Sequence, residues 1–319
     1  MNTAKTQIAQ THTVISNVSE TLMLRPSLVV PESFTNAMAS TQGEAGRKWL
    51  EGLPTLVESL CAEWNLIVDG APMHGYMGLV VPTRRGNELC ALKLPWVDED
   101  TAHEAAALAT WDGQGAVRLL DVRPNLEALL LERLDSESSL HSVELDEAIL
   151  VAGRLIRRLA VPAPTGLPQL KNVAARLAES LPERWEQLGR PMSRRLLDTA
   201  RDLTTQLGPT AGSSLVNHDL HYGNVLAGSR EPWLAIDPKV VVGDPEYGLA
   251  QLLWTRLEDM GSEAGFHRRF RALVGLAELD PERARSWTLV RCVDYWLWGL
   301  SVGFTEDPKR CEAIVNWLA

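Results

Sequence analysis

Apolar and polar positions divide the chain into segments with different periods. The first 30 residues are polar with few apolar anchors, which predicts a flexible leader. Over residues 31–64, apolar side chains recur at spacings of three and four, which predicts helical structure interrupted at Pro54. After residue 64 the apolar residues form short runs between turns, so the pattern changes there from helix to strand.

Five short apolar runs predict the strands of one antiparallel sheet. Turn residues separate them, with a loop over residues 69–78 and a turn over residues 84–87. An Ala-rich stretch over residues 100–111, capped by Asp100 or Thr101, predicts one helix between the third and fourth strands. The predicted strands cover residues 66–68, 79–82, 89–94, 117–120 and 126–132.

The remainder of the chain is predicted to be mostly helical. Asp280 and Asp307 are each followed by Pro and mark helix starts, because Asp caps a helix and Pro fits its first turn. Further helices are expected over residues 145–159, 170–188 and 192–207 and from Gly243 onward. The predicted fold class is α+β and bilobal: a small five-stranded antiparallel sheet over residues 31–134 and a larger helical lobe over residues 135–319.

Composition narrows the class of protein. The 319 residues are 45% hydrophobic and 23% charged, which is ordinary for a globular enzyme, and no apolar run is long enough to span a bilayer. The first 20 residues lack the apolar core of a signal peptide, so a cytoplasmic protein is expected. Its oligomeric state is expected to be a monomer or a homodimer. The four cysteines lack C-x-x-C spacing and are expected to be reduced and buried: Cys61, Cys90, Cys292 and Cys311.

The formal net charge of −10 bears on the partner. It argues against nucleic acid, whose binding relies on clustered Lys and Arg. An acidic cleft would instead attract a cationic small molecule. The alternative is that the charge serves only solubility.

The stretch from Ser214 to Glu246 carries the candidate chemistry. Asp219 and Asn224 are separated by four residues, the D-x-x-x-x-N spacing in which the Asp accepts a proton from an attacking hydroxyl and the Asn holds magnesium. Two apolar runs around Arg230 predict a β-hairpin that brings Asn224 roughly opposite Asp237. An amide oxygen and a carboxylate suit Mg²⁺ carried in on nucleotide phosphates.

Two other interpretations of this stretch stay open. The loop could be a solvated turn, since D-x-x-x-x-N alone occurs by chance. His218, Asp219 and His221 could instead hold zinc, although no cysteine lies nearby and the helical H-E-x-x-H spacing is missing.

Lys93 lies late in the third apolar run. A buried lysine needs an anion, and nucleotide phosphates would supply one; the alternative is a lysine that faces water on an edge strand. Glu104 on the following helix could orient Lys93, with Glu99 and Asp100 as competitors. The loop over residues 69–78 is not a phosphate-binding motif, because its glycines, Gly70, Gly75 and Gly78, are too widely spaced.

These motifs together carry a family resemblance over residues 31–303. Its most specific pieces are Asp219-Leu-His-Tyr-Gly-Asn-Val-Leu226 and Arg230-Glu-Pro-Trp-Leu-Ala-Ile-Asp-Pro-Lys239, with Gly243-Asp-Pro245, Leu129-Leu-Leu-Glu-Arg-Leu134 and Val161-Pro-Ala-Pro164 in support. The chain resembles the aminoglycoside phosphotransferase branch of the kinase-like fold. It is more closely similar to the aminoglycoside 6-phosphotransferase/hydroxyurea phosphotransferase family.

The resemblance implies a role for each matching residue. Asp219 would be the catalytic base, with Asn224 and Asp237 as the magnesium ligands. Lys93, oriented by Glu104, would bind the phosphates of ATP or GTP. The backbone of the connector that includes Glu132 and Leu134 would hydrogen-bond the adenine edge.

The chain departs from the family pattern at two places. Asn217 stands where relatives usually have His, which is thought to brace the loop, so the loop could be held differently here. The residues after Leu297-Trp298 are apolar where relatives often carry acids, so the acceptor could differ from streptomycin if this region lines its pocket. Tyr295, Trp296 and Trp298 are expected to pack in the core rather than to form a substrate platform.

The predicted function is transfer of the γ-phosphoryl group of ATP to a hydroxyl of a small, cationic, aminoglycoside-type antibiotic. Alternatives are another small acceptor (hydroxyurea, a peptide antibiotic or an amino sugar) or a non-catalytic nucleotide-binding protein. Protein substrates are not expected, because Asp237 to Asp244 leaves no room for an activation loop. Candidate acceptor contacts are the acids Asp244, Glu246, Glu258, Asp259 and Asp294.

Overall fold

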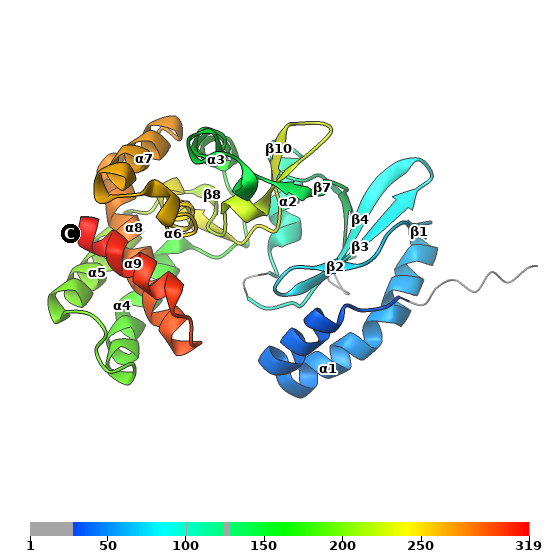
Figure 1. Cartoon of the computed structure of the whole chain (residues 1–319), viewed down its shortest axis with the longest axis horizontal. Coiled ribbons are helices and arrows are strands. Elements are labelled where there is room, and N and C mark those ends of the chain that lie inside the picture. Colours follow the sequence, from blue (N-terminus) through cyan, green and yellow to red (C-terminus); the bar gives the residue numbers. More distant parts are fainter. Residues whose placement is uncertain (1–27, 100, 124–127, 319) are drawn as a thin grey trace, which may run out of the picture.

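The computed structural model describes residues 28–99, 101–123 and 128–318. The leader predicted over residues 1–30 therefore lies almost entirely outside the described residues. A sheet with helix α1 (Glu32–Glu63) occupies one end of the elongated molecule, and helices occupy the other end (Figure 1). This is the mixed helix and antiparallel-sheet architecture that the sequence predicts.

The five predicted strands form the main path of the sheet. Neighbouring strands pair antiparallel in the order β1-β3-β4-β6-β5. The loop predicted over residues 69–78 holds a sixth strand, β2 (Met73–His74), which pairs with β3 across the turn at Gly75. Two residues are too few to show a period of two, so the sequence pattern missed it. The path strands are β1 (Ile67–Val68), β3 (Gly78–Arg85), β4 (Glu88–Pro95), β5 (Leu119–Arg123) and β6 (Ala128–Glu132).

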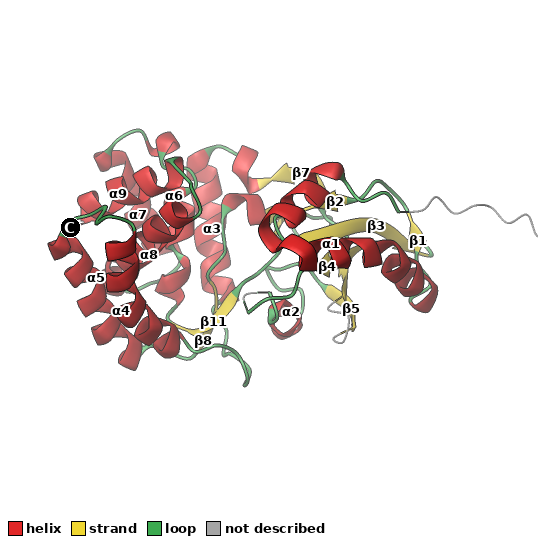
Figure 2. Ribbon diagram, turned by 90° about the horizontal axis from the view of Figure 1, so that it is seen from below, coloured by secondary structure: helices red, strands yellow, loops and turns green. Residues whose placement is uncertain are grey.

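Strand β6 is buried on both faces, and its alternating side chains join two cores. Ala128 and Leu130 pack with α1 in one hydrophobic cluster, whereas Leu129 and Leu131 belong to the large cluster of the helical half. The sheet is therefore covered by α1 on one face and by other elements on the opposite face (Figure 2).

Helix α1 is interrupted at Gly43 and not at Pro54 as predicted. Gly43 has φ 58°, in the left-handed region that glycine adopts without strain from a Cβ, whereas Pro54 lies within the helix. Helix α2 (Glu104–Trp111) begins later than predicted, with His103 at the N-cap position. Asp100 lies outside the described residues, and Thr101 Oγ1 donates instead to the carbonyl of Trp96 at 2.9 Å.

The helical half agrees closely with the predicted elements. Asp280 caps its helix by accepting from the amide of Arg283 at 2.8 Å, as predicted. The last helix begins at Glu306, so Asp307 lies within its first turn, and Gly243 is followed by a short 3₁₀ turn (Pro245–Gly248) before a helix. The helices are α3 (Leu145–Leu159), α4 (Leu170–Gln187), α5 (Arg194–Leu207), α6 (Ala250–Trp254), α7 (Glu263–Leu276), α8 (Pro281–Ser301) and α9 (Glu306–Leu318).

Two small strand pairings carry the chain through the region of candidate chemistry. The predicted hairpin is present as β9 (Val225–Ala227) and β10 (Trp233–Ala235), with β7 (Asp135–Ser139) beside β9. Strand β8 (Ser214–Asn217) pairs with β11 (Val240–Gly243). The loop that contains Asp219 is thus held by strands at both ends.

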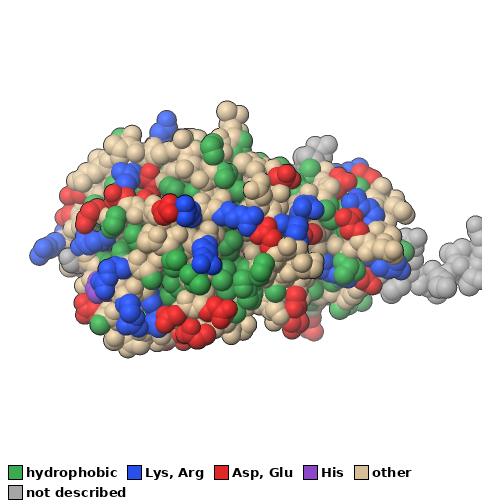
Figure 3. All heavy atoms as spheres, turned by 90° about the horizontal axis from the view of Figure 1, so that it is seen from above, with side chains coloured by type: hydrophobic (Ala, Val, Ile, Leu, Met, Phe, Trp, Pro, Cys, Tyr) green, Lys and Arg blue, Asp and Glu red, His purple; other side chains and the backbone are tan. Residues whose placement is uncertain are grey.

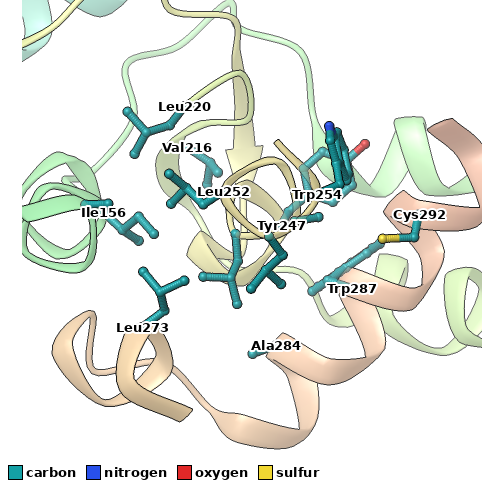
Figure 4. Packing of buried hydrophobic residues seen from close by; sticks show 14 of the residues in the cluster. Ile156, Val216, Leu220, Tyr247, Leu252, Trp254, Leu273, Ala284, Trp287 and Cys292 are labelled. Atoms are coloured by element: carbon teal, nitrogen blue, oxygen red, sulfur yellow. The ribbon is translucent and has the colours of Figure 1, made fainter. Parts of the chain in front are cut away.

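The core of the helical half is rich in large aromatic side chains. Tyr247, Trp254 and Trp287 are buried among Ile156, Leu252 and Leu273 (Figure 4). All four cysteines are buried thiols with no disulfide between them, as predicted. Within the described residues no helix is long and apolar enough to cross a membrane. Acidic and basic side chains are interspersed over the face in Figure 3, so the net negative charge does not gather there.

Candidate active site

Asp219 is fixed from three directions. Its backbone amide donates to Oδ1 of the buried Asn217 at 3.0 Å, and its carbonyl accepts from Nδ2 of Asn224 at 3.2 Å. Its carboxylate Oδ1 accepts from Nε2 of Gln251 in α6 at 2.8 Å. Asn217 thus braces the loop through its amide oxygen, at the position where relatives are expected to have His.

The hairpin brings Asn224 and Asp237 together nearly as predicted. The amide of Ile236 donates to the carbonyl of Asn224 at 2.9 Å, so Asn224 lies opposite the residue just before Asp237. Asp237 has φ 50°, a left-handed conformation that is uncommon for a residue other than glycine. Such conformations persist where the surroundings hold them and are frequent at functional sites.

Lys93 connects the sheet to this hairpin. Its Nζ lies 2.7 Å from both carboxylate oxygens of Glu104 and 2.6 Å from Oδ1 of Asp237. Lys93 and Glu104 are buried, whereas the Asp237 side chain is half-exposed. The expected Lys93–Glu104 pair is present, and the competitor Glu99 is exposed.

Burial and charge act in opposite directions on these groups. Burial raises the pKa of Glu104 to about 6, although the Lys93 ammonium opposes that shift. For Lys93, burial disfavours the ammonium, but the two carboxylates outweigh it and raise the pKa. The pKa of Asp237 is lowered, because Lys93 more than offsets the effect of burial. The three groups therefore form a charged network at neutral pH.

The two histidines of the loop have different surroundings. Burial lowers the pKa of His218 to about 3, with Arg291 and Lys239 adding to the effect, so this imidazole is neutral. His221 Nδ1 accepts from the amide of Gly223 at 3.1 Å and caps the short helical turn at Asn224. Across the part of the chain that the structure describes, no three His, Cys, Asp or Glu side chains are grouped to hold a metal ion, which disfavours the zinc alternative.

The connector after β6 is anchored through Glu132. The Glu132 carboxylate pairs with Arg230 Nη2 at 2.6 Å and accepts from the amide of Arg118 at 2.8 Å. Leu134 packs partly buried against the large core. The side chain of Glu132 is thus engaged within the protein, and the backbone amides of Glu132 and Arg133 donate to the carbonyls of Arg118 and Leu89.

The loop that contains Gly70, Gly75 and Gly78 lies close to Asp237. A Cβ built on Gly75 would be 3.9 Å from Oδ2 of Asp237, which places the tip of the β2–β3 hairpin beside this carboxylate. The loop that carried no recognisable motif is therefore close to the candidate magnesium ligand.

A cavity of about 490 Å³ opens beside Asp219. This volume is in the range of sites for small molecules. It is bounded by aromatic, charged and polar side chains: Tyr76, Arg184, His218, Asp219, Lys239, Gln251, Arg291, Asp294, Tyr295, Trp298 and Phe304.

Of the five acids expected to contact the acceptor, only Asp294 lines this cavity. The other four are engaged elsewhere. Asp244 is buried and accepts from Trp287 Nε1 at 2.7 Å and from the amide of Gly212 at 2.8 Å, besides pairing with Arg283. Glu246 is buried and accepts from the amide of Asp280, Glu258 pairs with Arg310, and Asp259 pairs with Arg256.

The expectation of core packing for the aromatic cluster of α8 is confirmed for Trp296 and in part for Tyr295, which packs partly buried against the large core. Trp296 is buried, but Tyr295 and Trp298 line the cavity. Tyr295 and Trp298 lie on the side of the helix that faces the cavity with Asp219. The apolar periodicity of α8 did not distinguish this side from the side that is buried in the core.

Gln251 and Lys239 are two neighbours of Asp219 that the sequence interpretation missed. Lys239 Nζ lies 3.9 Å from Oδ2 of Asp219, and Gln251 bonds the other oxygen. Gln251 is the one polar side chain in the apolar run from Tyr247 to Trp254. A polar residue in such a run could have indicated a role in the site. Lys239 follows two residues after Asp237 and had no separate signal.

Comparison with solved structures agrees with the fold. The crystal structure of aminoglycoside phosphotransferase APH(4)-Ia superposes with a TM-score of 0.58 at 16% identity, covering 83% of this chain and 98% of that one. Choline kinase LicA from Streptococcus pneumoniae gives a TM-score of 0.53 at 15% identity, covering 83% of this chain and 97% of that one. These likenesses establish the protein-kinase-like fold.

Sequence relatives are considerably closer. Streptomycin 6-kinase from Streptomyces glaucescens is 40% identical over 287 residues, covering 88% of this chain and 94% of the relative. Hydroxyurea phosphotransferase from Kitasatospora aureofaciens is 42% identical over 295 residues, covering 91% and 85%. Residues 63–303 match the family description "Aminoglycoside/hydroxyurea antibiotic resistance kinase".

The fold and these relatives define a kinase that acts on small molecules, an enzyme rather than a non-catalytic nucleotide-binding protein. More particularly, the chain belongs to the aminoglycoside/hydroxyurea antibiotic resistance kinase family. As a kinase it uses a nucleoside triphosphate and transfers a phosphoryl group to a hydroxyl group.

Proposed function

We propose that this kinase transfers the γ-phosphoryl group of ATP to a hydroxyl of a small-molecule antibiotic, with Asp219 orienting and deprotonating that hydroxyl. The observation that carries the proposal is that Asp219 lines the cavity, while Asp237, just after strand β10 of the hairpin that follows, contacts Lys93 together with Glu104. The relatives make streptomycin the first acceptor to test and hydroxyurea the second.

Nucleotide binding is assigned to residues 31–134. Lys93 would bind the phosphates, and Glu104 would hold its ammonium in place through two contacts of 2.7 Å. The backbone of the connector from Glu132 to Leu134 would bind the adenine edge. Asp237 now supplies the anion beside Lys93, and a nucleotide phosphate offers the same charge there.

The donor set near Asp237 fits Mg²⁺. Asn224 uses its amide nitrogen on the Asp219 carbonyl, which directs its amide oxygen away from that contact, and the Asp237 carboxylate is half-exposed. Two hard oxygen donors, with the rest supplied by water and phosphates, are typical of Mg²⁺ sites in kinases. When bound, the ion would neutralise charge on the phosphates.

The acceptor is assigned to the helical half, over residues 135–319. The acceptor hydroxyl would reach Asp219 from the cavity, and Gln251 would keep the carboxylate turned toward it. Most of the rate enhancement would come from positioning and from electrostatic stabilisation of the transferring group.

The decisive experiment measures phosphate transfer from γ-labelled ATP with Mg²⁺ to streptomycin and to hydroxyurea, in the wild type and in Asp219→Ala. Transfer should fall by about 10²–10⁴-fold in the variant while ATP binding persists. Asp202→Ala, at an exposed carboxylate of α5, is the matched control and should behave as wild type. Equal turnover by Asp219→Ala, or ATP binding without transfer to either acceptor, would contradict the proposal.

A further inference from the structure

Arg291 connects helix α8 to the loop that contains Asp219. Its Nη2 donates to the carbonyl oxygen of His218 at 3.0 Å, and its Nη1 donates to the hydroxyl of Tyr247 at 3.3 Å. Asp294, the acid one turn further along α8, is paired with Arg184 instead. The guanidinium of Arg291 is therefore directed at the backbone next to Asp219 and not at the neighbouring acid of its own helix.

Two aromatic rings set the direction in which Arg291 donates. The guanidinium carbon Cζ lies 4.7 Å from the ring centroid of Tyr247 and 5.8 Å from that of Trp254. Both rings are buried in the core of the helical half (Figure 4). A guanidinium that stacks on aromatic faces has its N–H groups around the edge of its plane, so the rings hold the plane and the N–H groups reach the loop.

The peptide group between His218 and Asp219 is held at both of its polar atoms. Its carbonyl accepts from Arg291, and its N–H donates to Oδ1 of Asn217 at 3.0 Å. The preceding amide, that of His218, donates to the carbonyl of Lys239 at 2.9 Å. Because a peptide group is planar, contacts at its two polar atoms fix its plane. This plane sets the direction in which the Asp219 side chain leaves the backbone.

The placement of Arg291 is not explained by stability. Its Nε is buried and, within the part of the chain that the structure describes, has no hydrogen-bond partner. A buried donor without an acceptor lowers the stability of a protein. Such a cost is typical of residues whose position serves the active site.

We propose that Arg291 is a positioning residue of this kinase: through the His218 carbonyl it fixes the peptide plane before Asp219 and so directs the Asp219 carboxylate at the acceptor hydroxyl. The inference rests on the proposed function, since Asp219 is the group that would activate that hydroxyl. Arg291 itself takes no part in the proton transfer. Because a misplacement of about 1 Å can cost about 10²-fold in rate, loss of this contact should lower kcat and leave nucleotide binding intact.

The test uses γ-labelled ATP, Mg²⁺ and whichever of streptomycin and hydroxyurea the wild type phosphorylates. Arg291→Ala should lower kcat about 10²-fold, while the KM for ATP stays within about twofold of wild type. Arg291→Lys should lose about tenfold, because an ammonium lacks the planar fork that reaches both the His218 carbonyl and the Tyr247 hydroxyl. Arg271→Ala, at an exposed arginine of α7, is the matched control and should behave as wild type.

A double variant separates positioning from a general loss of structure. Adding Arg291→Ala to Asp219→Ala should change kcat by less than about threefold, because a residue that acts through Asp219 then has nothing left to position. A variant that only loosened the fold would lower the residual rate of Asp219→Ala as well.

Wild-type kcat in Arg291→Ala or in Arg291→Lys would overturn the inference. A further fall of about 10² in the double variant would also overturn it, since the effect would then be independent of Asp219. Should Arg291→Ala fail to fold, Arg291→Lys decides on the same split between kcat and the KM for ATP. Absence of transfer by the wild type to both acceptors would instead count against the proposed function, and the inference would fall with it.

Discussion

Lys93 Nζ lies 2.6 Å from Oδ1 of Asp237, although the two residues are 144 positions apart in the chain. The contact joins strand β4 of the sheet to the loop that follows strand β10. Because Glu104 also contacts the same ammonium, one cation faces two carboxylates. The remaining negative charge is suited to a divalent cation, which is consistent with the proposed magnesium site.

Glu104 should give the enzyme an acid limb in its pH profile. Burial raises the pKa of Glu104 to about 6, so the carboxylate is ionised above that pH and protonated below it. Only the ionised form pairs with Lys93, so kcat/KM for ATP should fall as the pH is lowered through about 6. A pH series of initial rates at limiting ATP measures this.

The matched variant is Glu104→Gln, which keeps the shape of the side chain and removes its charge. Its kcat/KM for ATP should be lower at neutral pH, and the drop near pH 6 should be absent. An unchanged acid limb in Glu104→Gln would assign that limb to another group.

Asn217 should be needed to position Asp219. Asn217→Ala removes the acceptor of the Asp219 amide and should cost about 1 kcal/mol of stability and lower kcat about tenfold. Asn217→His offers a ring nitrogen that can accept the same hydrogen bond, so it should retain more activity than the Ala variant. Wild-type kcat in Asn217→Ala would show that the brace is dispensable. Unfolding in denaturant and steady-state rates provide the two measurements.

Lys239 should support the transferring group electrostatically. Its ammonium lies 3.9 Å from the Asp219 carboxylate and borders the cavity. Lys239→Met should lower kcat by about 10², the size of effect that follows loss of one preorganised electrostatic contact. Lys239→Arg should recover part of the loss. Lys309→Met, at an exposed lysine of α9, is the control, and equal rates for the two Met variants would refute the role.

Asp244 should matter for stability. It is buried and joins Arg283, Trp287 and Gly212, so Asp244→Ala leaves several donors without their acceptor. The free energy of unfolding should fall by about 3–5 kcal/mol, as for other broken buried ion pairs. Asp202→Ala should change it by less than about 0.5 kcal/mol. A small effect of Asp244→Ala in urea unfolding would contradict the structural assignment.

Local features of the chain were predictable from local pattern. The strands of the sheet path, helix α3 and the β9–β10 hairpin follow from periodicity and turn residues. The break in α1 and the start of α2 were misplaced, because backbone conformation at Gly43 and the Asp98–Thr101 turn overrode composition. Strand β2 was missed because its pairing depends on β3.

Local sequence pattern was enough to identify the residue types that could carry the chemistry: the spacing of Asp219 and Asn224, the second acid at Asp237, and a lysine within an apolar strand. The partners of these residues depend on how distant segments pack together. Gln251 at Asp219, the Asp237 contact to Lys93 and the Asp294 contact to Arg184 each join residues far apart in the chain. Periodicity reports which face of an element is buried, but not which distant side chain meets it there. The residues that line the cavity, and the hydrogen bonds and ion pairs of its acids, could therefore be identified only from the packed structure.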